Sequence, residues 1–417
     1  MEIVSKENQS NAIMGLEKFS QLSVQEIKTM FIPAMNEMRY QNEEKSENQF
    51  AGFNDGMMVA YYLFRDKHVD SSKMLSEKTI TAYRAAITQF LSDFQNYGYE
   101  LGFECTEVDS TGQFSILKSL RPRHVEKYTD WLQNDSPYVR ERGKKYSAAS
   151  ISQKVMILKG FLNKLYEWQY IETPIHFAFK SVTLTKHDKP NRDVTPDQVK
   201  FLLDVFQSMS HFPLFCITHF LVTTGIRNTE LCNLKVGDVK YDQMSKKYYI
   251  TVIAKGNKDR EIPLLQKTVD VLRIFRRLTG LQSFEEMALQ DANAPLFTTS
   301  RGTAFTASYL DHYYERQMSR FPTLVKEEIK KRFTYTEREN PLDKTSPIVE
   351  KQVKITPHVF RHAYAIISHH SGVALDVIKD SLGHNDRKTT EIYLESVIKK
   401  ERNAVNEWNT ELMDGYL

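Results

Sequence analysis

The sequence predicts a mainly α-helical protein with a small antiparallel β-sheet, divided into two principal domains. Apolar residues recur at helical spacing through most of the chain, whereas a β-branched and aromatic segment, 248–264, has the pattern of a hairpin. A polar, basic stretch that contains a proline, 179–194, separates two parts rich in apolar residues and is predicted to be an interdomain linker. The length of 417 residues also fits two or three domains.

Residues 1–72 are expected to form an N-terminal helical extension, whose role the sequence does not identify. Ser23 and Glu26 have the spacing of a capping box ahead of apolar Ile27, so a helix is predicted to start there. Pro33 is expected to bend or end that helix, because proline cannot donate to the helical hydrogen-bond ladder. The apolar run 57–64 should pack against another element.

Residues 73–178 are predicted to be a small helical domain. Helices are expected over 76–94, 122–132 and 148–168, where apolar residues fall on one face of each. The domain also carries six basic residues that could face a nucleic-acid backbone, although solvated helix faces are an alternative interpretation. These residues are Arg121, Arg123, Lys144, Lys145, Lys154 and Lys159.

Residues 195–417 are predicted to be a second, mixed domain with a C-terminal tail. Thr195 followed by Pro196 is typical of a helix start, and helices are expected over 196–207, 211–224 and 228–235. Strands 248–254 and 260–264 should pair across a Lys-Gly-Asn-Lys-Asp turn. The polar segment 332–353 is expected to be a loop within an insertion at 321–355.

Bulk composition excludes several classes of protein but does not identify a partner. The net charge is only +3, so any basic surface must be local. Three widely spaced cysteines lack metal or redox-motif spacing and are expected to be buried thiols in a reducing compartment. Neither a signal peptide nor a membrane span is evident, which predicts a cytoplasmic protein without membrane contacts.

Six residues of the second domain form a set suited to phosphate chemistry. His358 and Arg361 share a face of a predicted helix that Thr356 and Pro357 begin, and a helix N-terminus attracts phosphate. Taken singly each signal is weak: an arginine is usually paired at the surface, and a tyrosine is often core. The pair of histidines at 358 and 362 lacks a further ligand, so no metal is expected. The full set is Arg227, Lys255, His358, Arg361, His384 and Tyr393.

These residues resemble the tyrosine recombinase (phage integrase) family. The resemblance rests on four strings: 223–231 (TTGIRNTEL), 254–264 (AKGNKDREIPL), 358–362 (HVFRH), and 382–384 (LGH) followed by 390–393 (TEIY). It covers roughly residues 76–400 and is strongest in the C-terminal half. It implies a helical core-binding (SAM-like) domain and a mixed catalytic domain that together close on DNA as a C-shaped clamp.

The resemblance also implies a role for each residue. Tyr393 would be the nucleophile, Arg227 and Arg361 would bind the scissile phosphate, and Lys255 would be the general acid. His358 and His384 would bind the phosphate or assist proton transfer, and Glu230 would orient Arg227. No cofactor or metal is implied. Further DNA contacts are expected from the linker and hairpin residues Lys186, Lys189, Arg192, Lys258 and Arg260.

The implied activity is site-specific recombination through a 3′-phosphotyrosyl intermediate and a Holliday junction, for integration or excision of a mobile element or phage. The implied partners are double-stranded recombination sites, a homotetramer on DNA, and accessory directionality or DNA-bending proteins. A terminal helix with an apolar stripe usually docks on its own domain, but the resemblance favours docking of the apolar residues in 397–417 on a neighbouring protomer. Two alternatives stand beside this: a DNA-binding transcriptional regulator on the same scaffold, and a telomere resolvase or type IB topoisomerase. The target sequence, the accessory factors and the host element cannot be deduced from the chain.

Overall fold

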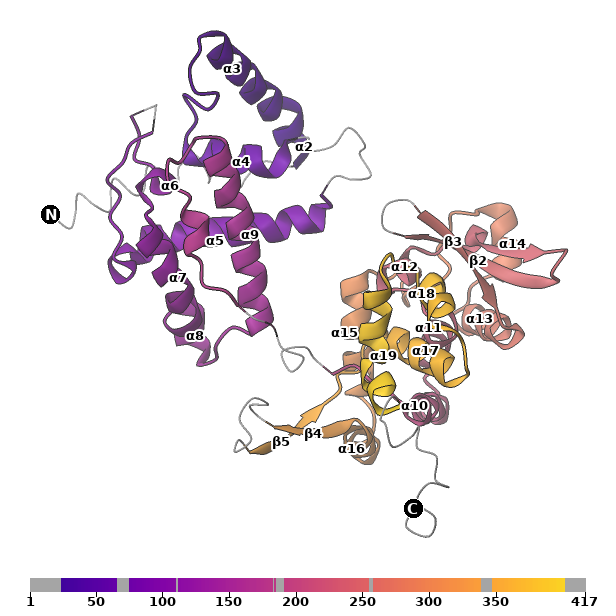
Figure 1. Ribbon diagram of the computed structural model, residues 1–417. Helices are drawn as coiled ribbons and strands as arrows, with labels where there is room; N and C mark the ends of the chain where they lie inside the picture. The colour runs from indigo at the N-terminus through magenta and orange to yellow at the C-terminus, as the bar shows by residue number, and fades with distance from the viewer. Residues whose placement is uncertain are drawn as a thin grey trace, which may run out of the picture. The chain divides into compact units, whose positions relative to one another are not determined.

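The computed structural model describes residues 24–65, 75–109, 112–182, 184, 191–254, 258–338 and 347–401. The chain folds as two compact units, Met1–Lys189 and Pro190–Leu417, each with its own hydrophobic core (Figure 1). Both are mainly helical, and the small sheets are antiparallel, which confirms the predicted fold class. Within the described residues, every helix is too short or too polar to span a bilayer.

The described part of the first unit is entirely helical apart from its loops. Its elements are α2 (Val24–Glu26), η1 (Ile27–Phe31), α3 (Ile32–Glu44), α4 (Asp55–Phe64), α5 (Glu77–Leu101), α6 (Ile116–Ser119), α7 (Pro122–Asn134), α8 (Pro137–Arg142), α9 (Ala148–Glu167) and η3 (Ile175–Ala178). The three expected helices correspond to α5, α7 and α9. Their starts follow from local chemistry, because Ser76 and Ser147 accept backbone N–H bonds at the starts of α5 and α9.

Pro33 does not end the first helix, although the sequence left open that it bends or ends it. The chain continues from α2 through one turn of π-helix, η1, directly into α3, which contains Pro33 near its start. A wider turn just before a proline accommodates the missing N–H, and the N–H of Ile32 accordingly bonds the carbonyl of Ile27, five residues earlier.

Residues 24–65 do not form a part separate from the helical domain, contrary to the expected boundary at residue 72. Helix α4 is almost wholly buried and packs on α5 and α9 within one shared core. Asp55, at the start of α4, is buried and accepts hydrogen bonds from the Ser115 hydroxyl (2.6 Å), the Leu117 amide (3.1 Å) and the Tyr170 hydroxyl (2.8 Å). Three partners from other segments therefore join α4 to the rest of the unit.

The second unit contains helices around a central one, with a three-stranded sheet at one side (Figure 1). Its elements are α10 (Pro196–Ser208), α11 (Phe212–Thr224), α12 (Asn228–Asn233), η5 (Val236–Asp238), β1 (Val239–Asp242), β2 (Lys247–Ala254), β3 (Lys258–Leu264), α13 (Gln266–Leu278), α14 (Phe284–Gln290), α15 (Ala307–Met318), α16 (Thr323–Arg332), β4 (Thr334–Arg338), β5 (Ile348–Gln352), α17 (Pro357–His370), α18 (Leu375–Leu382) and α19 (Arg387–Glu401). Helix α11 is the central element and packs against α13, α17 and α10.

The predicted hairpin is present as β2 and β3. These strands pair antiparallel, with Ile250 opposite Ile262, and β1 adds a third strand on the far side of β2. The predicted linker is anchored at both ends: Phe179 is buried in the first core and Val194 in the second. The linker lysines Lys186 and Lys189 lie outside the described residues, as does the tail from 402 onward.

The segment 332–353, expected to be a loop or an insertion, contains two strands in its described part. It contains a second antiparallel hairpin, β4 with β5, in which Thr336 lies opposite Glu350. Both strands carry polar side chains at most positions, so they lack the apolar alternation by which a strand is usually identified.

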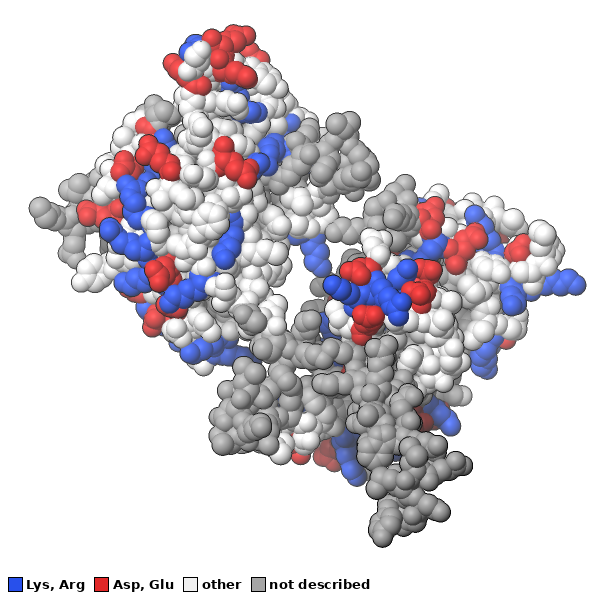
Figure 2. Space-filling view, in the orientation of Figure 1, with Lys and Arg blue, Asp and Glu red and all other residues white. Residues whose placement is uncertain are grey.

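Charge is distributed without a dominant sign over the surface in view. Figure 2 shows basic and acidic side chains interspersed on both units. This agrees with the small net charge of +3 and means that anion binding depends on particular pockets rather than on a general basic face.

Candidate active site

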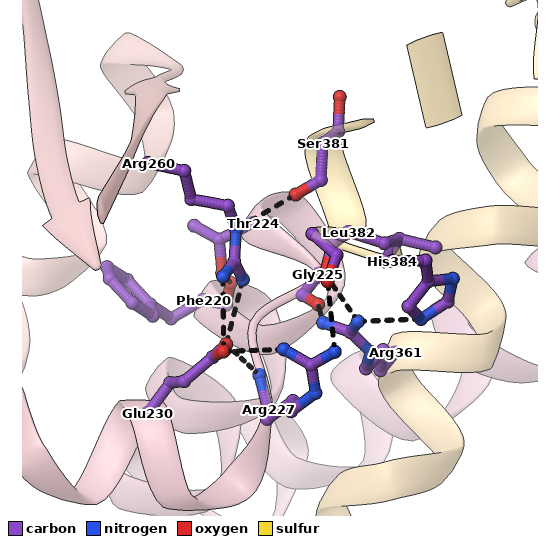
Figure 3. Close-up of polar contacts among 11 residues, drawn as sticks. Phe220, Thr224, Gly225, Arg227, Glu230, Arg260, Arg361, Ser381, Leu382 and His384 are labelled. Carbon is purple, nitrogen blue, oxygen red and sulfur yellow. Dashed lines mark hydrogen bonds and ion pairs between the residues drawn. The ribbon is translucent and has the colours of Figure 1, made fainter. Parts of the chain in front are cut away.

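Arg361 is the most deeply buried charged residue of the candidate site, at 1% exposure in the first turns of α17. Its guanidinium donates to the carbonyl oxygens of Gly225 (2.6 Å) and Leu382 (2.6 Å), and its Nη2 lies 2.9 Å from Nε2 of His384 (Figure 3). Burial, and then the charge of Arg227, lower its pKa to about 10, so it remains a cation at neutral pH. Its buried Nε–H has no acceptor in the described part of the chain.

Arg227 stands beside Arg361 but is more open, with 37% of its side chain exposed. It occupies the N-cap position of α12, where Glu230 accepts both its backbone N–H (2.8 Å) and its Nη1 (2.7 Å). Its Nη2 donates to the Gly383 carbonyl at 3.3 Å. The predicted contact between Glu230 and Arg227 is therefore present, and the three-residue spacing accounts for it because one helical turn brings the carboxylate back to the N-cap.

Tyr393 lies among three histidines, here called the histidine cluster: His358, His362 and His384. The ring centroid of Tyr393 is 6.1 Å from that of His358, 3.8 Å from that of His362 and 5.1 Å from that of His384. Tyr393 is half-buried, and it lies close enough to Arg361 to act on the pKa of that guanidinium, which it raises. The structure thus brings together the expected nucleophile, both expected histidines and an expected phosphate-binding arginine.

The histidine cluster is neutral at pH 7. Burial is the largest cause, and neighbouring charges add to it, so the pKa is lowered to about 4 for His358, about 3 for His362 and about 4 for His384. Arg361 contributes to all three shifts. Arg192, at the end of the linker, contributes to the shifts of His358 and His362, which places this predicted DNA contact close to the site.

Hydrogen bonding identifies the tautomer of His384. A guanidinium can only donate, so Nε2 of His384 accepts from Arg361. Nδ1 then carries the proton and donates to the hydroxyl of Thr390 at 2.8 Å. In this arrangement both nitrogens are occupied, and His384 acts first as a support for Arg361.

Some of the predicted contact residues are placed differently or are not described. Lys255 lies outside the described residues, and Lys258 is placed only as a residue of β3. Arg260 does not project to a DNA surface: its side chain is 13% exposed and pairs with Glu230. In the first unit, Arg123, Lys144 and Lys145 are exposed, and Lys159 is half-buried. Arg121 pairs with Glu107, and Lys154 hydrogen-bonds Gln89.

Two residues of the site were missed in the sequence or given another role. His362 packs on Tyr393, and its two buried ring nitrogens have no hydrogen-bond partner among the described residues. The i, i+4 spacing from His358 was the available signal, since it places both rings on one face of α17. Arg260 also belongs to the site, because it shares Glu230 with Arg227. The spacing of residues within β3 gives no indication of this contact.

A cavity of ≈ 800 Å³ opens beside Arg227, lined among others by Glu230, Arg260, His384 and Asn385. Guanidinium groups with free donor capacity, next to a phenolic hydroxyl, are suited to bind a phosphate and present a nucleophile to it. No cluster of three or more metal-ligating side chains occurs in the described ranges.

The sequence and the fold both have known relatives. Residues 192–399 match the model of the phage integrase family. A tyrosine recombinase of Pseudothermotoga lettingae is 24% identical over 338 residues, which cover 80% of this chain and 93% of that protein. The tyrosine recombinase XerD of Rickettsia conorii is 27% identical over 334 residues, which cover 78% of this chain and 90% of that protein.

Two solved structures share the fold. A lambda integrase dimer bound to a COC′ core site has a TM-score of 0.51 at 14% identity, with 81% of this chain and 75% of that chain covered. The XerH recombinase bound to a palindromic difH substrate, in a post-cleavage complex, has a TM-score of 0.51 at 16% identity, with 90% of this chain and 94% of that chain covered.

Proposed function

Because this chain belongs to the phage integrase family of tyrosine recombinases, we propose that it cleaves and rejoins double-stranded DNA at specific sites through Tyr393. We further propose that the reaction serves the integration or excision of a mobile element or phage. The relatives that support a DNA substrate are proteins whose structures contain core-site or difH DNA.

One observation carries the proposal: the buried Arg361 guanidinium, beside Tyr393, has donor capacity left. Arg361 keeps its Nε–H without an acceptor among the described residues, although buried donors are almost always satisfied. A phosphate oxygen at this position would satisfy that donor. Arg227, the more open guanidinium, would take the second non-bridging oxygen.

The proposed cleavage step balances without a metal or an energy source. The Tyr393 oxygen forms a bond to phosphorus, and the bond from phosphorus to the 5′-oxygen breaks. A neutral imidazole of the histidine cluster can take the phenol proton, and Lys255 is proposed to protonate the leaving 5′-oxygen. The 3′-phosphotyrosyl bond preserves the energy of the diester, so a 5′-hydroxyl from another strand can reverse the step and rejoin the DNA.

Exchange between two duplexes requires four such cleavages, so we propose a homotetramer on DNA. The tail would contribute by docking on a neighbouring protomer, and accessory directionality or DNA-bending proteins would set the outcome. A telomere resolvase or type IB topoisomerase would share the cleavage step but not the exchange between two sites. A transcriptional regulator would bind DNA without forming any covalent adduct.

Covalent trapping tests the proposal. Purified protein is incubated with a genomic library of duplexes that carry nicks, so that the released strand diffuses away and the adduct accumulates. Wild type should form an SDS-stable adduct, and sequencing of the trapped DNA should give one site. Tyr393→Phe should bind the same DNA and form no adduct, whereas the control Tyr364→Phe, nearby on α17, should still form it. An adduct with Tyr393→Phe would refute the assignment of the nucleophile.

A further inference from the structure

Arg260 belongs to the polar network in Figure 3, and its side chain has little access to solvent. From strand β3 it donates to both carboxylate oxygens of Glu230, at 3.1 and 2.8 Å. Its Nε donates to the carbonyl of Ser381 at 3.2 Å. The backbone of Gly383 lies against it so closely that a Cβ there would be 3.0 Å from Nη1.

The C-terminal end of α18 holds three arginines through three consecutive carbonyl groups. Arg260 donates to the carbonyl of Ser381, Arg361 to that of Leu382 (2.6 Å), and Arg227 to that of Gly383 (3.3 Å). The carbonyls that end a helix lack helical partners and lie at its negative pole, so they are favourable acceptors for cations. This end of α18 therefore sets the spacing of the three guanidinium groups.

Glu230 is shared between two of these arginines. Oε1 accepts from Nη1 of Arg227 (2.7 Å) and from Nη1 of Arg260 (3.1 Å). Oε2 accepts from the Arg227 amide and from Nη2 of Arg260, each at 2.8 Å. Burial alone would raise the pKa of Glu230, but the bonds from Arg260 and Arg227 lower it to about 2, so it carries a full negative charge.

That charge must be balanced by a group other than Arg227 if Arg227 is to attract a phosphate. A carboxylate paired with one guanidinium cancels most of its field, whereas a carboxylate shared by two leaves the pair with a net positive charge. Arg260 supplies the second positive charge from a buried position and leaves the exposed guanidinium available.

We propose that Arg260 is a positioning residue for strand cleavage: it occupies Glu230 and the end of α18, and thereby fixes the orientation and the net charge of Arg227. Arg260 itself does not touch the phosphate. The proposal rests on the proposed function, since it assigns Arg227 to the scissile phosphate.

The test measures single-turnover cleavage of the trapped, nicked site by four proteins: wild type, Arg260→Met, Glu230→Gln and the double variant. Arg260→Met should slow cleavage on the order of 10- to 100-fold, because Glu230 then turns fully toward Arg227. Adding Glu230→Gln should recover part of that loss, since a neutral amide cannot cancel the charge of Arg227. Arg273→Met, which breaks a surface ion pair with Glu285 on α13 and α14, is the matched control and should cleave like wild type.

A substrate with a methylphosphonate at the scissile position separates positioning from a general folding defect. This phosphate analogue has lost its charge, so the ratio between wild type and Arg260→Met should fall toward one. Equal ratios on both substrates, cleavage by Arg260→Met at the wild-type rate, or no recovery in the double variant would each overturn the inference. If wild type itself forms no adduct with any DNA, the proposed function fails instead.

Discussion

The two arginines assigned to the phosphate should differ sharply in what they contribute to stability. Arg361→Met keeps the length of the side chain but removes every donor, and so orphans the buried carbonyls of Gly225 and Leu382. An unsatisfied buried acceptor costs ~1–3 kcal/mol, so the two together cost ~2–6 kcal/mol. Removal of a desolvated charge offsets part of this, and we expect the free energy of unfolding to fall by ~2–4 kcal/mol.

Arg227→Met should change the stability much less. The Arg227 side chain is 37% exposed, and its partner Glu230 keeps both bonds from Arg260. We expect a change of no more than ~1 kcal/mol, the usual scale of a partly exposed ion pair. Both variants should lose cleavage by ~10²-fold or more, as when a donor to transition-state charge is removed.

Urea denaturation at pH 7, paired with single-turnover cleavage, measures both quantities. Arg276→Met is the matched control, because Arg276 is equally buried at 1% and donates to the carbonyls of Gln282, Pro295 and Leu296. It should be destabilised like Arg361→Met, yet cleave normally at urea concentrations where it is folded. Equal destabilisation of the Arg227 and Arg361 variants would refute the reasoning.

Two further predictions follow from the histidine cluster and from Gly225. The histidine cluster has folded-state pKa values of about 3 to 4, below the ~6.5 of an unfolded histidine, so the unfolded state binds more protons between these values. The free energy of unfolding should therefore rise as the pH increases from 4 to 6.5, by up to ~1.4 kcal/mol per pH unit for each ring, and stay constant above pH 6.5. Urea midpoints that do not change across this pH range would contradict the prediction. Gly225 has φ +65°, and a Cβ would lie 2.6 Å from the ring of Tyr364, whereas Gly280 has φ +73° with nothing in the described residues within 4 Å. Gly280→Ala should lower the free energy of unfolding only by the ~1 kcal/mol that an alanine in the left-handed region costs, and Gly225→Ala should lower it clearly more. Equal losses for the two variants in urea denaturation would show that the Tyr364 ring moves away without cost.

Helices and the first hairpin could be predicted because their signals are local. The side chain of Thr195 caps α10 as its position before Pro196 indicated, and Gly383 ends α18 with φ +64°. The β4–β5 hairpin was missed because its strands are short and mostly polar, and β5 has no fully buried residue to mark one face. β1 has only four residues, and Val239 is the one buried residue among them.

The candidate site could be predicted only at the level of its residue types. Tyr393, Arg361 and His384 occur in recognisable strings, and the structure places Arg361 and Tyr393 against His384. The groups that hold them are largely backbone carbonyls, such as those of Gly225 and Leu382. A carbonyl acceptor carries no side-chain signature, so the sequence offers no indication of which residues provide it.

Burial, and then the balance of charge, explain why the histidines are neutral in the free protein, and the balance of charge is what DNA would change. Arg227 and Arg260 share the Glu230 carboxylate and Arg361 adds a third positive charge, so protonation of the histidine cluster would add charge to an already positive, buried region. A phosphodiester in this region would cancel part of that field and raise the pKa of each ring. We therefore expect the cluster to become a better proton acceptor when DNA is bound, which favours transfer of the Tyr393 proton in the occupied site.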